Sequence, residues 1–258
     1  MKTIIIFDVD NTIYSKTYKK VLPKTKKLIK TLYNNPDIEL GVATGRGLKK
    51  LDVIDDILYM FKYKIVVNGA AVFVDEKMIF DEPIKIEDIK EVLALTKGKD
   101  FNIGMVGIND EAVNFWDDRI GYGMKALRGV FPKVDETFYL HTPVYQLWMF
   151  ADYESKILEI AQKMNKFRVF PWHQGGADFT YPHINKAFGI KKALMDEHYD
   201  RLICIGDGYN DIEMLDYADI AIAMENTRFN ELKEKATYIA PAIEKDELYD
   251  FFKSIDII

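Results

Sequence analysis

"IIIFDVDNT", residues 4–12, is an apolar run that leads straight into two aspartates one residue apart. The run predicts a buried strand, and Asp8 stands where that strand should end. Alternation along an extended backbone points Asp8 and Asp10 to the same side and turns Val9 to the packing side. A buried strand that delivers paired carboxylates indicates a chemical role at its end.

Similar apolar runs, rich in β-branched residues, recur along the chain and alternate with helical patterns. The further runs are 39–43, 64–67, 201–205 and 219–223, and the helical stretches are 21–34, 46–61, 186–198 and 210–217. Short apolar strands that alternate with helices predict a parallel sheet covered on both faces. We therefore expect an α/β fold with a Rossmann-like, doubly wound parallel sheet.

The middle of the chain follows a different pattern. Residues 71–80 predict a hairpin that turns at Asp75 and Glu76. Helices are then expected near 86–97, 118–128 and 154–164, and strands near 101–107, 111–115, 144–150, 167–171 and 177–181. We interpret this as an inserted α+β domain, 83–181, within a core formed by 1–82 and 182–258.

Composition narrows the class of protein. The 258 residues are 48% hydrophobic and 29% charged, with a net charge of −6, as in an ordinary soluble globular protein without the basic face of a nucleic-acid binder. No segment approaches 18 apolar residues, so we expect no membrane span and a cytoplasmic protein. Cys204, the single cysteine, is expected to be buried and inert. The lysines between 16 and 30 are interpreted as the solvated face of a helix.

Three other apolar strands also end in polar, glycine-rich stretches: GVATGR (41–46), VVNGA (66–70) and ICIGDGYND (203–211). The carboxyl ends of parallel strands lie at one edge of a sheet, where ligands bind. The residues expected to converge there are Asp8, Asp10, Thr44, Arg46, Asn68, Asp207, Asn210 and Asp211. Four carboxylates in one cleft repel each other unless a cation is present, and oxygen ligands suit Mg²⁺. A magnesium site in turn indicates a phosphorylated ligand.

DVDNT, ATGR, Lys186 and GDGYND, in this order, resemble the haloacid dehalogenase superfamily of aspartate-nucleophile phosphatases. More narrowly, NGA, a large insert and then NKAFGIKKAL resemble the Cof-type branch, which carries a class IIB cap at this point of the chain. The resemblance implies a Mg²⁺-dependent phosphatase that hydrolyses a small organic phosphate monoester, such as a sugar or cofactor phosphate. An aspartyl-phosphate intermediate and a cap that sets substrate specificity are also implied.

The resemblance also implies a role for each site residue. Asp8 would attack phosphorus, Asp10 would act as acid and then base, and Thr44 and Lys186 would bind the phosphoryl oxygens. Mg²⁺ would be held by Asp8, the Asp10 main-chain carbonyl and Asp207, with Asp211 assisting. The residues implied or expected to contact phosphate or substrate are Thr44, Gly45, Arg46, Asn210, Asn68 and, at a hairpin tip within 171–178, His173.

One residue departs from the family pattern, because Asn11 stands where the branch usually has glycine. Asparagine tolerates a left-handed backbone better than most residues, so we expect an unchanged turn.

Other interpretations stay open for most of these residues. Asp8 and Asp10 could be a helix cap and a turn residue, Thr44 and Asp211 could cap helices, Asn68 could serve only a turn, and Lys186 could be a surface lysine. For the whole chain, a phosphomutase and a phospho-accepting receiver-like domain are the alternatives. The sequence names neither the substrate nor the oligomeric state.

Overall fold

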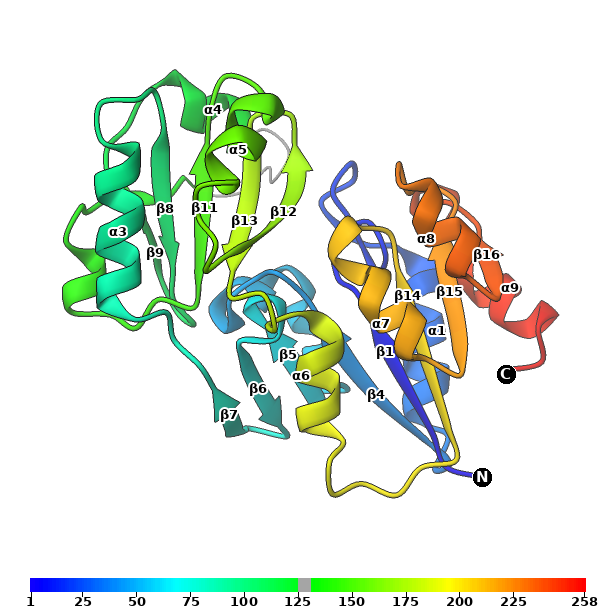
Figure 1. The fold of residues 1–258 in the computed structure, drawn as a ribbon. Coiled ribbons are helices and arrows are strands. Elements are labelled where there is room, and N and C mark those ends of the chain that lie inside the picture. The colour runs from blue at the N-terminus through cyan, green and yellow to red at the C-terminus, as the bar shows by residue number, and fades with distance from the viewer. Residues whose placement is uncertain (125–130) are drawn as a thin grey trace. The chain divides into compact units, whose positions relative to one another are not determined.

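The computed structural model describes residues 1–124 and 131–258, which divide into two compact units. The core unit comprises Met1–Phe80 and Lys186–Ile258, and the inserted unit comprises Asp81–Asn185. Figure 1 shows the two units, coloured by residue number.

An eight-stranded sheet forms the centre of the core unit. Its strand order is β16 (Tyr238–Ala240), β15 (Ile220–Met224), β14 (Arg201–Gly206), β1 (Thr3–Phe7), β4 (Ile38–Ala43), β5 (Tyr63–Val66), β6 (Ala71–Val74) and β7 (Lys77–Asp81). The strands from β16 to β5 pair in parallel, and β6 pairs with β5 antiparallel. The predicted parallel α/β core is thereby confirmed, with an antiparallel edge.

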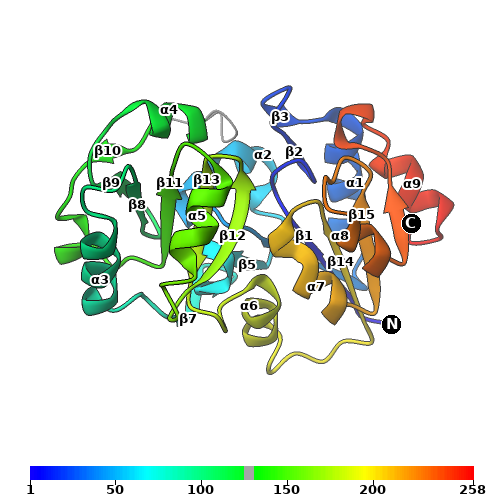
Figure 2. The same ribbon diagram turned by 45° about the horizontal axis from the view of Figure 1, so that its top comes forward.

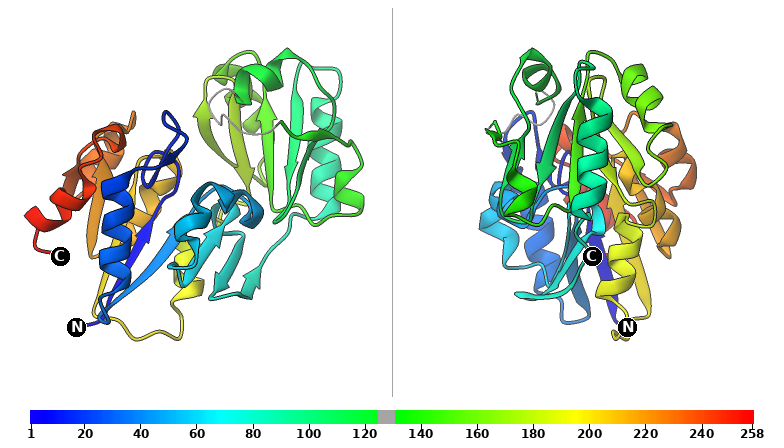
Figure 3. Two further views of the ribbon diagram at one scale, coloured as in Figure 1. Left: turned by 180° about the vertical axis from the view of Figure 1, so that it is seen from behind. Right: turned by 60° about the vertical axis from the view of Figure 1, so that its left-hand side comes forward.

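Helices cover both faces of this sheet (Figures 1 and 3). One face packs against α6 (Lys186–Ala193), α7 (Ile212–Tyr217) and α8 (Asn230–Lys235), whose apolar residues share a cluster with Ile4 and Ile6. On the other face lie α1 (Pro23–Tyr33) and α9 (Leu248–Ser254), where Phe252 stacks on Phe7 with ring centroids 6.2 Å apart. Every residue of β1 is buried, which explains its unbroken apolar run.

Two predicted segments of the core unit are corrected. The expected helix over 46–61 is a 3₁₀ helix, Leu48–Ile54, followed by one short turn, α2 (Asp55–Leu58). The lysines do not share one helix face, because Lys16 and Lys20 belong to a hairpin of β2 (Tyr14–Ser15) and β3 (Lys20–Val21). Helix α1 begins only at Pro23, since proline at the first position fixes a helical φ and needs no N–H partner.

The inserted unit is built on its own six-stranded sheet, seen from another side in Figure 2. The order is β10 (Lys133–Val134), β9 (Glu111–Val113), β8 (Asn102–Val106), β11 (Gln146–Phe150), β13 (Gly176–Thr180) and β12 (Arg168–His173). Helices α3 (Ile86–Thr96) and α5 (Glu154–Ala161) pack on one face through a shared apolar cluster. The predicted α+β pattern is present here, and the helix expected near 118–128 is described as α4 (Asp118–Met124), its remainder lying outside the described residues.

Cys204 is buried in β14, and burial raises the pKa of its thiol, as expected for an inert cysteine. Within the described part of the chain, no helix combines the length and apolar character that crossing a bilayer requires.

Candidate functional site

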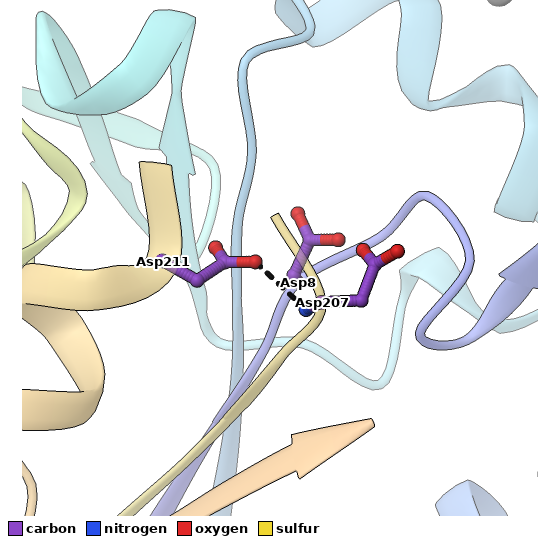
Figure 4. A group of neighbouring side chains, drawn as sticks. All are labelled: Asp8, Asp207 and Asp211. Carbon is purple, nitrogen blue, oxygen red and sulfur yellow. Dashed lines mark hydrogen bonds between the residues drawn. The ribbon is translucent and has the colours of Figure 1, made fainter. Parts of the chain in front are cut away.

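Three carboxylates meet at the carboxyl edge of the core sheet (Figure 4). Asp8 follows β1, Asp207 follows the neighbouring strand β14, and Asp211 ends the 3₁₀ turn that leads into α7. One oxygen of each lies within 4.8 Å of the others. Residues far apart in the sequence meet because β1 and β14 run in parallel with Phe7 beside Ile205.

Lys186, the first residue of α6, joins two of these carboxylates. Its Nζ donates to Oδ1 of Asp8 at 2.6 Å and to Oδ1 of Asp211 at 2.5 Å, and its side chain is fully buried. The alternative of a surface lysine is therefore wrong. An ammonium group buried to this degree persists only when it is paired, and here both partners are carboxylates.

Asp211 uses both carboxylate oxygens on protein partners. While Oδ1 accepts from Lys186, Oδ2 accepts the backbone N–H groups of Asp207 at 2.9 Å and Gly208 at 2.7 Å. Although Asp211 stands at the N-cap position of α7, its side chain makes no capping hydrogen bond to that helix. Its carboxylate braces the loop that carries Asp207, which suits a supporting role toward a metal.

Asp10 lies beside this group and is paired with two cations. Arg46 donates from Nε to Oδ2 and from Nη2 to Oδ1, both at 2.8 Å, and Lys16 Nζ lies 3.6 Å from Oδ1. Burial alone would raise the pKa of Asp10, but Lys16 and Arg46 reverse this and hold it well below its usual range. Lys16 was not among the predicted site residues, since its approach to Asp10 depends on the hairpin rather than on a motif.

The pKa shifts of Asp8, Asp207 and Lys186 show that the carboxylates of the site have too little positive charge around them. Burial raises the pKa of Asp8 to about 7, with Lys186 opposing the rise and Asp211 and Asp10 adding to it. Burial also raises the pKa of Asp207 well above its ordinary value, helped by Asp8 and Asp211. For Lys186, burial lowers the pKa, but the two carboxylates it contacts outweigh burial and raise it. Buried carboxylates that repel each other are hard oxygen donors, and they fit a divalent cation such as Mg²⁺.

The ATGR stretch forms the loop after β4. Thr44 is buried, and its Oγ1 accepts the backbone N–H of Arg46 at 3.2 Å. Gly45 lies between them and is half-buried. Thr44 does not cap the following 3₁₀ helix, because the N-cap position belongs to Gly47 and carries no side-chain cap. Its hydroxyl therefore contacts the backbone of Arg46, the residue whose side chain pairs with Asp10.

Asn68 and Asn210, from two different loops, contact each other. Asn210 Nδ2 donates to Asn68 Oδ1 at 2.8 Å, and Asn68 is buried with a left-handed backbone, φ 57°. Asn68 is thus a turn residue and also a partner of Asn210. The side chain of His173, expected at a hairpin tip of the inserted unit, lies outside what the structure describes.

Asn11 adopts the left-handed backbone that its position requires, with φ 56°. Its N–H donates to the carbonyl of Tyr14 at 2.7 Å, which closes the turn after Asp10. Asn226, just beyond β15, was also not predicted as a site residue, and its side chain reaches Asp207 and the Asn11 carbonyl. Its position in the apolar-to-polar transition AIAMEN is the signal that could have identified it, because other strand ends reach this edge as well.

A family model described as haloacid dehalogenase-like hydrolase matches residues 5–252. The chain therefore belongs to this family of hydrolases, which confirms the resemblance seen in its motifs.

Two curated relatives match the chain along nearly its whole length. "Putative phosphatase YkrA" of Bacillus subtilis is 26% identical over 258 residues, which is 99% of this chain and 98% of that protein. A Streptococcus pyogenes protein named "Putative bifunctional phosphatase/peptidyl-prolyl cis-trans isomerase" is 26% identical over 263 residues. This chain spans only about half of that second relative, 54% of its length. Both names include the word phosphatase.

Among solved structures, the subclass IIB sugar phosphatase BT4131 superposes with a TM-score of 0.85 at 24% identity. The match covers 100% of both chains. At this identity the likeness shows a shared fold, and it includes the inserted unit as well as the core.

Proposed function

We propose that this protein is a Mg²⁺-dependent phosphatase that hydrolyses a small organic phosphate monoester, with sugar phosphates as the first class to test. The observation that carries the proposal is the buried Asp8 at the end of β1, held by Lys186 beside Asp207, with Asp10 two residues further along. A carboxylate presented in this way can act as a nucleophile, and its neighbour can serve as acid and base. The names of the relatives and the shared fold of the sugar phosphatase agree with this proposal.

The proposed reaction has two steps. An oxygen of Asp8 attacks phosphorus, the bond to the leaving oxygen breaks, and Asp10 gives its proton to that oxygen to release an alcohol. Water then attacks the phosphorus of the aspartyl-phosphate, Asp10 takes the water's proton, and the bond to Asp8 breaks to release inorganic phosphate. Because Arg46 and Lys16 hold Asp10 ionised in the free site, Asp10 must first take up a proton from solvent, and we propose that these two cations turn toward the phosphoryl group of the bound substrate to allow this.

Magnesium fits the donor set that the structure presents. Asp8, Asp207 and the main-chain carbonyl of Asp10 would hold the ion. Asp211 would support Asp207 by accepting its backbone N–H. The ion would supply positive charge to the phosphoryl oxygens and to the nucleophile. Thr44 and Lys186 would add hydrogen bonds to the same oxygens.

The charge balance of the site favours a dianionic ligand. Four carboxylates face three cations there: Asp8, Asp10, Asp207 and Asp211 against Lys16, Arg46 and Lys186. The formal sum is −1, and a bound Mg²⁺ would change it to +1. A phosphate monoester carries the opposite sign and would be attracted to the loaded site. A small phosphorylated metabolite is accordingly the proposed partner, and the cytoplasm, where such metabolites occur, is the proposed location.

The first experiment measures phosphate release from sugar, nucleotide and cofactor phosphates, with Mg²⁺ and with EDTA. We expect turnover on at least one class, and we expect EDTA to abolish it. Turnover that is indifferent to EDTA, or none on any substrate, would reject the proposal. Conversion of a hexose 1-phosphate into its 6-phosphate without free phosphate would instead identify a phosphomutase.

Asp8→Asn tests the nucleophile. The amide cannot form the aspartyl-phosphate, so we expect kcat to fall by about 10³-fold or more while the protein remains folded. Circular dichroism and the melting temperature serve as the control for folding. Wild-type turnover in this variant would remove Asp8 from the proposed role.

A further inference from the structure

Asn226 uses both ends of its side-chain amide on the loops of the site. Its Nδ2 donates to the carbonyl of Asn11 and to Oδ2 of Asp207, both at 3.2 Å. Its Oδ1 accepts the backbone N–H of Ile243 at 3.0 Å. An asparagine offers two N–H donors and one carbonyl oxygen, so every group of this side chain has a partner of the right kind.

The two acceptors belong to the two loops that would supply the magnesium ligands. Asp207 offers a carboxylate, and Asn11 follows directly on Asp10, whose carbonyl is the proposed third ligand. The hydrogen bond to the Asn11 carbonyl holds the Asn11–Thr12 peptide, which directly follows the peptide that contains the Asp10 carbonyl. A single side chain therefore connects the loop after β1 with the loop after β14.

The third partner anchors this connection to the scaffold. Glu225, next to Asn226, donates its N–H to the carbonyl of Ala240 at 2.8 Å, and its Oε2 accepts the N–H of Ala242 at 3.2 Å. Together with the bond from Ile243, these contacts fasten residue 226 to the segment that follows β16. The backbone N–H of Ile243 thus anchors the side chain of Asn226, which in turn donates hydrogen bonds to the loops after β1 and β14.

We propose that Asn226 is a positioning residue for the divalent cation, a role that rests on the metal dependence of the proposed function. Asp207 lies beside Asp8, and like charges at this distance drive the two carboxylates apart. The bond from Nδ2 fixes Oδ2 of Asp207 and leaves Oδ1 available for the ion. In Figure 4 the carboxylates of Asp8 and Asp207 both extend beyond the strand ends, and one oxygen of each lies within 4.8 Å of the other, an arrangement in which one cation would contact both.

The test is a calorimetric Mg²⁺ titration of the metal-free full chain, without substrate. Partners that orient metal ligands typically account for about 10- to 100-fold in metal affinity, so we expect Asn226→Ala to weaken Mg²⁺ binding by that factor. Asn226→Ser, which keeps one short donor, should give an intermediate affinity. Asn230→Ala is the matched control, since Asn230 is exposed at the start of α8, and it should bind as the wild type does.

Melting temperatures of the metal-free variants separate positioning from a merely structural role. A structural role would lower the melting temperature and leave the Mg²⁺ affinity of the folded protein unchanged. An affinity of Asn226→Ala within twofold of the wild type would overturn the inference, and Asn226→Ser carries the same test if the alanine variant does not fold. Wild-type turnover that needs Mg²⁺, together with unchanged affinity in the variants, would reject the role of Asn226 alone. A wild-type chain that binds no Mg²⁺ would reject the metal dependence itself and this role with it.

Discussion

Asp10 receives positive charge from two different elements, and only one of them belongs to a motif. Arg46 reaches it from the loop after β4, and Lys16 reaches it from the β2–β3 hairpin. The hairpin is fixed by Ser15, which is buried and accepts the N–H of Tyr18 at 3.2 Å. Lys16, the next residue, lies over the site rather than in free solvent, because its Nζ is 3.6 Å from Oδ1 of Asp10 and its side chain is only 20% exposed.

Replacing Lys16 tests whether this second cation contributes to turnover. Lys16→Met removes a charge that steadies Asp10 and attracts the phosphoryl group, so we expect kcat/KM to fall by about 10-fold. Lys16→Arg should retain most of the activity. Lys20→Met is the control, because Lys20 lies on the same hairpin and is exposed. Equal losses in Lys16→Met and Lys20→Met would show that Lys16 has no specific role.

Helix α6 carries Lys186 into the site only because the helix lies close against the loop after β5. A Cβ at Gly189 would lie 2.5 Å from Cγ2 of Ile65 and 2.8 Å from Cα of Gly69. The second of these neighbours is backbone and cannot rotate away. The small size of residue 189 therefore sets how deeply α6 sits and, with it, the reach of Lys186 to Asp8.

Gly189→Ala should move α6 away from the sheet. We expect the free energy of unfolding to fall by about 2 kcal/mol through overpacking, and turnover to fall with it as Lys186 withdraws. Chemical denaturation and the phosphatase assay measure the two effects. In the control Gly121→Ala, within α4, the new Cβ meets nothing within 4 Å, so stability should stay constant or rise by up to about 1 kcal/mol. An unchanged stability in Gly189→Ala would contradict the account of the helix position.

At the scale of the whole molecule, the acidic site lowers the stability of the metal-free protein. The pKa of Asp8 is about 7 in the folded chain against an ordinary value of 3.8, so the folded state binds more protons than the unfolded state between these values. The free energy of unfolding must then decrease as the pH rises through this window. Binding of Mg²⁺ should offset the loss, most strongly at the upper end.

Asp207→Asn separates the destabilisation caused by carboxylate repulsion from the stabilisation that bound Mg²⁺ provides. Above pH 7 we expect the metal-free variant to melt at a higher temperature than the wild type, because one repelling charge is gone. Added Mg²⁺ should raise the melting temperature of the wild type and leave that of the variant almost unchanged. Melting curves between pH 5 and 8 provide the measurement, with the exposed Asp196→Asn as control. A metal-free variant that is less stable than the wild type throughout would contradict the electrostatic account.

Local patterns in the sequence were sufficient to predict the positions of the central strands and of the motif loops. The apolar runs of β1, β4, β14 and β15 end within a residue or two of where they were expected, since strand period and turn residues are properties of neighbouring positions. The prediction of a helix over 46–61 was wrong because it, too, used only the local pattern. Its apolar spacing satisfies a helical period, but the packing of Leu51 and Ile54 is met by a 3₁₀ helix instead.

The sequence alone determined that Asp8 and Asp10 follow a buried strand and that the chain belongs among proteins with this motif order. Only the tertiary structure decided that Lys186 spans Asp8 and Asp211, that Arg46 and Lys16 both pair with Asp10, and that Asn226 reaches Asp207. The reason is physical. Which strand neighbours β1, and how deeply a helix or hairpin sits against it, depend on packing between segments far apart in the chain, and side-chain distances follow from that packing.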